Sequence, residues 1–294
     1  MVKENTHLFG AYRIFERLDE NLKEMIKENI DYYYIGAIAL DIFFFYNKTH
    51  FVSDKIHGKD GELTSEIIFE LLKSRDKRDL AFVFGYLTHC AFDIEFHPVI
   101  YYYTGNYYDK NKEKRDRAIY LHRHFETYID NKLKHRFLIY KIIKKNLIKD
   151  LLFFKIIVRD YKITMEEIEK ALNNELFLNR LFRSSIGYYV TLLITKLGIS
   201  DKKNPGLFYK NLGRDKIIFE QDLRYKDIIS GKNIRKDFDK LFDESLEYGR
   251  EMINTAYKFY NNKINKSQAV KVIDGKSLDT GKLGIGVSKI RYCL

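Results

Sequence analysis

Apolar side chains recur at intervals of three or four residues along most of this chain. The first such run extends from Leu8 to Asn29, and its spacing predicts an α-helix there. Thr164 followed by Glu167 has the pattern of a capping box, which predicts that another helix begins at this point. The same spacing predicts further helices over residues 64–73, 79–96, 112–133, 182–197 and 238–261.

Other segments are less regular. Residues 32–46 are apolar and fit either a strand or a buried helix, and the helical surroundings favour a helix. Pro98 is expected to end the helix over residues 79–96, because the residue before a proline is disfavoured in the α conformation. Residues 47–62 are polar and contain turn signals, and residues 101–111 are aromatic with a glycine, so we expect two loops.

Composition supports an all-α fold. Proline, the commonest helix breaker, occurs only twice among 294 residues, and hydrophobic residues reach 45%. There is no internal repeat and no Pro- or Gly-rich linker that would divide the chain. We therefore expect one multi-helix domain over residues 1–263. Residues 264–294 are rich in Gly, Ser and Lys without a helical period, and we expect a loosely ordered C-terminal tail.

The charge of the chain favours anionic partners. Lys and Arg number 52 against 41 Asp and Glu, a formal charge of +11, which suits phosphate esters, nucleic acid or an acidic membrane. Two cysteines exclude a disulfide framework. The N-terminal residues carry no apolar signal-peptide core, and no apolar run is long enough to span a bilayer. We expect a cytoplasmic or peripheral membrane protein, or a secreted one if a leader was removed.

A polar stripe follows the predicted helix over residues 79–96. His89, Asp93 and His97 are spaced four residues apart, so on a helix they lie along one face between apolar neighbours. Eight helical residues rise about 12 Å, whereas zinc lies only about 2 Å from each ligand atom. His89 and His97 are therefore expected to bind different ions, with Asp93 giving one oxygen to each.

Further residues extend this set. His122 and Glu126 are again four residues apart and can offer two ligands to one ion. His57 and Asp41 are two more candidates, and Asp41 interrupts a run too apolar to hold an isolated charge. Histidine-rich ligation favours zinc, and a ferritin-like di-iron site would need two Glu-x-x-His pairs, whereas this sequence has one, Glu4-x-x-His7.

Each of these patterns has a simpler interpretation. One histidine four residues from a carboxylate is more often a hydrogen-bonded pair than a metal site, and His122 with Glu126 could belong to a solvated charged face. Three histidine or carboxylate motifs of this kind occur in one chain, each beside apolar sequence. Together they favour metal binding over a hydrogen-bonded pair or a solvated face. The remaining histidines, His50, His124 and His135, are expected at the surface.

The order of these motifs resembles the zinc-dependent phospholipase C family, which shares its helical fold with the zinc-dependent single-strand nucleases. The resemblance covers about residues 5–132. The family usually has a proline before the aspartate, where this chain has Leu40. The motifs that carry the resemblance are Thr6-His7-x-x-Gly10, Gly36-Ala-Ile-Ala-Leu-Asp41, His57, His89-x-x-x-Asp93-x-x-x-His97-Pro98 and His122-x-x-x-Glu126-x-x-x-Asp130.

The resemblance implies two or three Zn²⁺ ions per chain. The implied ligands are Asp41, His57, His89 and Asp93 for one ion, and His97, His122 and Glu126 for a second. A third ion would use His7, Asp93 and the N-terminal amine and carbonyl, supplied by Met1 or, after its removal, by Val2. Asp41 is the implied catalytic residue, both a ligand and the general base for the attacking water.

The resulting prediction is a zinc-dependent phosphodiester hydrolase, first of all a phospholipase C that cleaves the head-group ester of a phospholipid with a metal-activated water. A nuclease or nucleotidase acting on single-stranded nucleic acid and a metal-stabilised, non-catalytic binding protein are the alternatives. Phe43–Tyr46, Tyr101–Tyr103 and the basic, apolar segment Leu133–Lys162 are compatible with peripheral membrane contact. The aromatic segments equally suit the core, and the basic segment a solvated helix. The oligomeric state is not indicated.

Overall fold

The structure, a computed structural model, describes residues 3–133, 137–213 and 221–294. Within these ranges it is all-α except for one hairpin of antiparallel strands, β1 (Asp222–Lys226) and β2 (Asn233–Asp237). The α-helices are α1 (Glu4–Glu16), α2 (Glu20–Glu28), α3 (Ile30–Ile38), α4 (His50–Ile56), α5 (Glu66–Leu71), α6 (Lys77–Thr104), α7 (Lys112–Lys132), α8 (Ile139–Ile142), α9 (Leu152–Tyr161), α10 (Met165–Phe182), α11 (Ser185–Lys196), α12 (Phe238–Tyr260) and α13 (Lys266–Ala269). Short 3-10 helices are η1 (Ile42–Phe45), η2 (Lys145–Asp150), η3 (Asn204–Leu207), η4 (Tyr209–Gly213) and η5 (Val287–Lys289).

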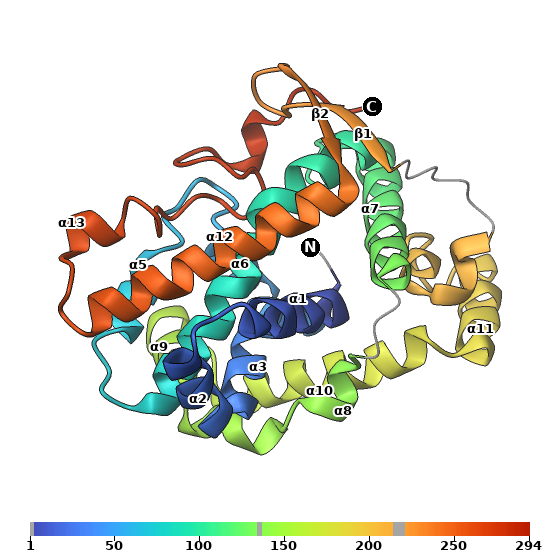
Figure 1. Ribbon diagram of the computed structural model, residues 1–294. Helices are drawn as coiled ribbons and strands as arrows, with labels where there is room; N and C mark the ends of the chain where they lie inside the picture. The colour runs from blue at the N-terminus through green and yellow to red at the C-terminus, as the bar shows by residue number, and fades with distance from the viewer. Residues whose placement is uncertain (1–2, 134–136, 214–220) are drawn as a thin grey trace.

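The long helix α6 lies at the centre of the molecule, with α1, α3, α7 and α12 packed against it (Figure 1). Two glycines allow α3 and α6 to approach closely. A Cβ at Gly36 would lie 2.0 Å from the carbonyl oxygen of Phe82, and one at Gly85 would lie 1.8 Å from that of Tyr33. This close contact holds the end of α3 against the polar stripe of α6.

Pro98 does not end α6, contrary to our prediction. The helix continues to Thr104 with Pro98 inside it. A proline within a helix costs about 3 kcal/mol, because it removes one backbone hydrogen bond and crowds the preceding turn. Val99, Ile100 and Tyr101 are all buried beyond it, and burial of each such side chain contributes about 1.5–3 kcal/mol. Tertiary packing therefore outweighs the local preference of the proline.

The N-terminal third contains more helix boundaries than predicted. The run over residues 8–29 is divided, because the Asp19 side chain accepts a hydrogen bond from the Leu22 N–H and starts α2 there. The apolar segment over residues 32–46 is divided between α3 and η1. The segment over residues 47–62, predicted to be a loop, contains α4.

The helices predicted over residues 112–133, 182–197 and 238–261 are confirmed as α7, α11 and α12 within three residues at each end. The capping box of Thr164 and Glu167 is present at the start of α10.

The basic segment Leu133–Lys162 is not one helix in its described part. It forms α8, η2 and α9, and its large apolar side chains face the core; Ile139, Ile148, Phe153 and Phe154 have no exposed surface. None of the described helices is long and apolar enough to cross a membrane.

Residues 264–294, expected to be loosely ordered, pack against the helical core. Ile273 and Leu278 have no exposed surface, and Val287 is buried. The hairpin, which the sequence did not reveal, contacts α6 through β1 and α12 through β2. The C-terminal part of the chain thus covers the same helix that carries the polar stripe.

Candidate metal centre

The structure brings all eight candidate ligands together in the interior, between α1, α3, α6 and α7. None is more than 7% exposed. They are contributed by α1 (His7), the turn after α3 (Asp41), the end of α4 (His57), α6 (His89, Asp93 and His97) and α7 (His122 and Glu126).

The carboxylate of Asp93 occupies the middle of the cluster. Its Oδ2 atom lies 3.0 Å from Nε2 of His89 and 3.6 Å from Nε2 of His57. Its Oδ1 atom lies 3.4 Å from Nε2 of His7 and 3.5 Å from Nε2 of His97. The two oxygens therefore face different histidines, as a carboxylate shared between two cations would.

Asp41 completes a four-residue group on the Oδ2 side of Asp93. Its Oδ1 atom lies 3.3 Å from Nε2 of His57 and 3.7 Å from Nε2 of His89. Four ligand atoms at the corners of a tetrahedron, each about 2.1 Å from a zinc ion, lie about 3.4 Å apart. The four nitrogen–oxygen separations between these carboxylates and histidines are close to this value. Ligand atoms of His57, His89 and Asp93 all lie within 4.8 Å of one another, so these three have the right size for one zinc ion, with Asp41 beside two of them.

A second group is formed by His97, His122 and Glu126. Each offers one ligand atom, and these atoms all lie within 4.8 Å of one another. Nε2 of His122 is 3.2 Å from Oε1 of Glu126. Because His97 also faces Oδ1 of Asp93, the second group adjoins the first through that carboxylate.

His7 lies between the two carboxylates of the first group. Its Nε2 atom is 3.4 Å from Oδ1 of Asp93 and 4.0 Å from Oδ2 of Asp41. Its ring stacks on that of His89 with a centroid distance of 3.8 Å and an interplanar angle of 7°. Ligand atoms of His7, Asp41 and His89 also lie within 4.8 Å of one another. The N-terminal amine, expected to join His7 at a third ion, lies outside the described residues.

Backbone carbonyl groups fix the orientation of three of the histidines. Nδ1 lies 2.7 Å from the Ser53 oxygen in His57, 3.0 Å from the Ala37 oxygen in His89 and 2.7 Å from the Leu278 oxygen in His97. A carbonyl oxygen can only accept a hydrogen bond, so each Nδ1 carries the proton. In a neutral ring the Nε2 atom is then a hydrogen-bond acceptor.

These Nε2 atoms face carboxylate oxygens, which are also acceptors. In His57, His89 and His97 the Nε2 atom is buried and makes no hydrogen bond, and neither oxygen of Asp41 makes one. Buried acceptors that face each other at 3–4 Å are unfavourable unless a cation lies between them. The donor set, imidazole nitrogen with carboxylate oxygen, is one that zinc accepts. The residues present therefore fit zinc.

The pKa values of His97 and His89 are shifted in opposite directions. Burial lowers the pKa of His97 to about 3, so this ring is neutral at physiological pH. Burial also disfavours a charged His89, but Asp93 and Asp41 outweigh it and raise the pKa of His89 to about 9. Without a metal, a proton on His89 would offset one carboxylate. One proton can relieve only one such pair, and a divalent cation would compete with it for Nε2.

The C-terminal segment is part of this site, which the sequence did not reveal. Leu278 accepts the hydrogen bond from Nδ1 of His97, and its own N–H donates to the carbonyl of His57 at 2.8 Å. The Tyr101 hydroxyl donates to Oδ1 of Asp279 at 2.8 Å. Gly281, with φ of +65°, lies against α6, where a Cβ would be 2.7 Å from the Ile94 oxygen. Glycine adopts a positive φ readily, so Gly281 itself was the sequence signal of an ordered turn here. The composition of residues 264–294 as a whole did not reveal it.

Two more buried acids lie close enough to Asp41 for its charge to affect their pKa values. Burial raises the pKa of Glu4 to about 7. Burial also raises the pKa of Glu175 well above its ordinary value, and neither of its oxygens makes a hydrogen bond. The charges of Glu4 and Asp41 raise the pKa of Glu175 further. No spacing to a candidate ligand distinguishes Glu175 from a surface glutamate, whereas Glu4 lies three residues before His7.

The histidines outside the cluster differ from expectation in one case. His124 is buried, not at the surface, because η4 covers its side of α7; its ring stacks on Tyr120 and its Nδ1 lies 3.4 Å from Nδ2 of Asn211. His50 is partly exposed, near Asp54. His135 lies outside the described residues.

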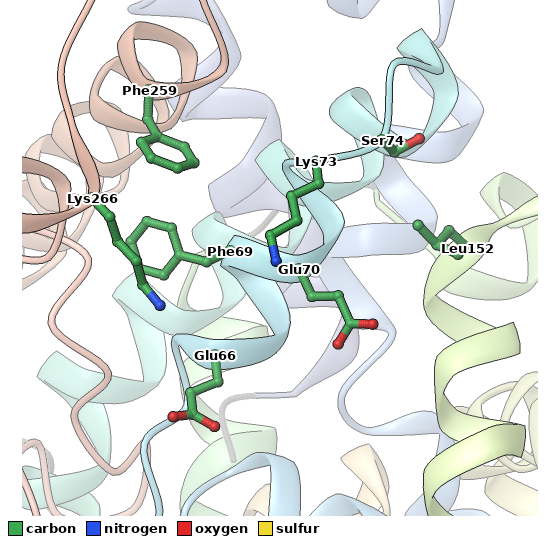
Figure 2. A pocket seen from close by; sticks show the side chains of 8 residues that line it. All are labelled: Glu66, Phe69, Glu70, Lys73, Ser74, Leu152, Phe259 and Lys266. Carbon is green, nitrogen blue, oxygen red and sulfur yellow. The ribbon is translucent and has the colours of Figure 1, made fainter. Parts of the chain in front are cut away.

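A surface hollow of about 650 Å³ lies apart from the candidate ligands (Figure 2). Its side chains come from α5, α9, α12, α13 and the turn after α5. Glu70 there pairs with Arg159, and Lys266 lies over the Phe69 ring, so two of its charged groups already have partners. Its lining residues are Glu66, Phe69, Glu70, Lys73, Ser74, Leu152, Phe259 and Lys266. The chemistry of the buried cluster makes that cluster, not this hollow, the candidate site.

Comparison with known protein families gives one match. The family model described as zinc dependent phospholipase C matches residues 6–191, well over half of the chain. No curated protein and no solved structure matches. The matched region contains all eight candidate ligands, while Leu278 and Asp279 lie beyond it.

Proposed function

Because this chain belongs to the zinc-dependent phospholipase C family, we propose that it hydrolyses the ester bond between the glycerol and the phosphate of a phospholipid. The buried cluster is its proposed active site. The family supports a zinc-dependent, phospholipase C-like hydrolase in general. The phospholipid substrate, the number of ions and the role of each residue are parts of the proposal.

One observation carries this assignment. Nε2 atoms of His57 and His89, held by backbone carbonyls on the other side of each ring, face the carboxylates of Asp41 and Asp93 at 3.0–3.7 Å. A hydrogen-bonded core would place a donor opposite each acceptor. A cation bound between the four residues would account for this arrangement. A chance grouping of buried polar residues would not.

The two groups would hold two ions. Asp41, His57, His89 and Asp93 form the first proposed ligand set, and His97, His122 and Glu126 form the second. The second set has three residues of its own, and Oδ1 of Asp93 adjoins it, 3.5 Å from Nε2 of His97, as the carboxylate shared with the first set. His7 with Asp93 is the proposed remainder of a third site.

Asp41 is the proposed general base. Its Oδ1 atom faces His57 and His89, while its Oδ2 atom makes no hydrogen bond. Bound zinc supplies a lowered water pKa and neutralises phosphate oxygens. Asp41 Oδ2 would accept the proton as the water oxygen bonds to phosphorus, and the bond from phosphorus to the glycerol oxygen breaks. The proton held by Asp41 then passes by way of solvent water to that oxygen, which restores the base. Burial of the cluster excludes competing water from this transfer.

A nuclease activity is the competing function, because the chain carries a formal charge of +11 that also suits nucleic acid. The two are separated by incubating zinc-loaded, full-length protein with phosphatidylcholine in detergent micelles and with single-stranded DNA. The proposal expects release of the phosphorylated head group from the lipid, and loss of that release after chelation. DNA cleavage without lipid cleavage would favour the nuclease. A zinc-loaded protein that cleaves neither would favour a binding protein.

A further inference from the structure

Helix α11 has an unusual distribution of apolar side chains. Ile186, Val190, Leu193 and Leu197 recur every three or four residues and so share one face of the helix, and they are 77%, 51%, 58% and 64% exposed. Gly187, Tyr188 and Thr191 occupy the buried side of the helix. A surface helix normally turns its apolar side to the core and its polar side to water. Here the more apolar side faces solvent.

Exposed apolar residues are concentrated around this helix. Seven of the twelve large hydrophobic side chains exposed among the described residues fall within residues 177–199. Besides the four on one face of α11 they are Phe177, Tyr189 and Ile199. Isolated exposed apolar residues are common, but a group of this kind marks a surface that binds something apolar. We call Ile186, Tyr189, Val190, Leu193, Leu197 and Ile199 the α11 apolar surface.

The charges within residues 176–200 are all of one sign, and Asp201, which follows them, pairs with Lys203. Residues 176–200 contain Arg180, Arg183 and Lys196 and no acidic residue. Arg183 pairs with the buried Asp130, whereas Arg180 and Lys196 are exposed. An apolar face with exposed cations near it is complementary to an anionic membrane, whose surface attracts each cation. A second copy of the chain would instead bring like charges together.

The α11 apolar surface is also connected to the candidate metal centre. Figure 1 shows α11 at the edge of the molecule, beyond α7. The 3-10 helices η3 and η4 contact both α11 and α7, the helix that carries His122 and Glu126. Arg123 of α7 donates to Oδ1 of Asn204 at 3.0 Å, which fixes η3 to that helix. A partner bound at α11 would thus be held at a defined position relative to the cluster.

We propose that the α11 apolar surface docks the protein on an anionic lipid bilayer, with Ile186, Val190 and Leu193 inserted among the acyl chains near the head groups. This inference rests on the proposed phospholipid hydrolysis, since docking would bring the active site to a membrane-bound substrate. In the segments first considered for membrane contact, Phe43 and Tyr101 are buried and the other aromatic side chains of Phe43–Tyr46 and Tyr101–Tyr103 are half-buried. In α9, Phe153, Phe154, Ile156 and Ile157 are buried.

The test compares zinc-loaded, full-length wild type with an Ile186→Ser/Val190→Ser/Leu193→Ser variant. Binding is measured by sedimentation with vesicles of phosphatidylcholine alone and of phosphatidylcholine mixed with phosphatidylserine. Wild type is expected to bind the mixed vesicles, and the triple variant to bind them at least about tenfold more weakly. An Arg180→Glu/Lys196→Glu variant should lose its preference for the mixed vesicles. Phe51→Ser/Leu63→Ser, a matched change of exposed apolar residues elsewhere, should bind like wild type.

A second measurement separates this proposal from the proposed function. Hydrolysis of a short-chain phosphatidylcholine below its micelle concentration should be unchanged in the triple variant, because no membrane is involved. Vesicle binding without hydrolysis of the soluble lipid would refute the function and leave the docking surface. Wild type that does not bind vesicles, or equal binding by the triple variant, would overturn the docking surface. So would a wild-type dimer, seen by light scattering, that the triple substitution converts to a monomer.

Discussion

Replacement of Asp93 by asparagine changes the charge at the centre of the cluster with little change in shape. The carboxylate contacts histidines of both proposed zinc groups, through Oδ2 to His89 and through Oδ1 to His97. An amide keeps one oxygen as a ligand but replaces the other with an NH₂ donor. Because the charge of Asp93 helps to raise the pKa of His89, its removal lowers that pKa, and the amide donor can then bond to Nε2 of the neutral ring. The metal-free variant should therefore be at least as stable as metal-free wild type.

The zinc-loaded variant should lose most of its stabilisation by metal. Zinc at about a thousand times its dissociation constant stabilises a folded protein by about 4 kcal/mol per site. In a chain of this size, about 4 kcal/mol corresponds to a rise in melting temperature of about 8–16 °C. Asp93→Asn weakens both groups and should remove most of the rise. His122→Ala disrupts one group and should remove about half of it.

The assay is thermal unfolding of each variant with added zinc and with a chelator, so that every protein serves as its own metal-free reference. Glu95→Gln is the control, because Glu95 lies on the same helix but pairs with Lys236 outside the cluster. Its zinc-dependent rise should equal that of wild type. An Asp93→Asn protein that retained the full rise, or equal partial losses in Asp93→Asn and His122→Ala, would refute the bridging role.

Three further predictions concern residues around the cluster. Asp41→Asn should keep most of its zinc yet hydrolyse a phosphodiester at least about a hundredfold more slowly; near-normal turnover by the zinc-loaded variant would remove Asp41 from the mechanism. Gly281→Ala should lower zinc affinity and melting temperature more than Gly284→Ala, since both have positive φ but only the first would contact the Ile94 oxygen; equal effects would exclude a positioning role for this turn. Glu175 has a folded-state pKa above its ordinary 4.5, so its contribution to stability is lost as pH rises through the folded-state value. Glu175→Gln should thus gain in melting temperature relative to wild type between pH 4.5 and 8, and a difference independent of pH would contradict the raised pKa.

Much of the cluster was predictable because its spacing follows helix geometry. His89, Asp93 and His97 lie on one face of α6 as their four-residue spacing requires, and Asp93 faces a histidine on each side. The family resemblance supplied His7, which has no such spacing to any other ligand. That these residues bind zinc, and how many ions, stays a prediction.

The contribution of the C-terminal segment could not be predicted. Leu278 contacts His97 across 181 positions of the chain, through a backbone carbonyl that every residue possesses. Hydrogen bonds of this kind leave no trace in residue type. The continuation of α6 past Pro98 and the burial of His124 have a related cause, since tertiary packing decided both against the local preference. The exposed face of α11 has a regular helical period, and the period alone does not tell which side faces the core.

The zinc content of the protein tests the central claim most directly. Full-length protein purified with zinc present, then freed of loosely held metal by gel filtration, is analysed for zinc per chain by elemental analysis. Because seven of the eight buried residues form two adjoining groups, the account predicts at least about two tightly bound zinc ions per chain. Less than about one zinc ion per chain in folded protein would contradict it, because the buried nitrogens and carboxylates would then face one another without a cation.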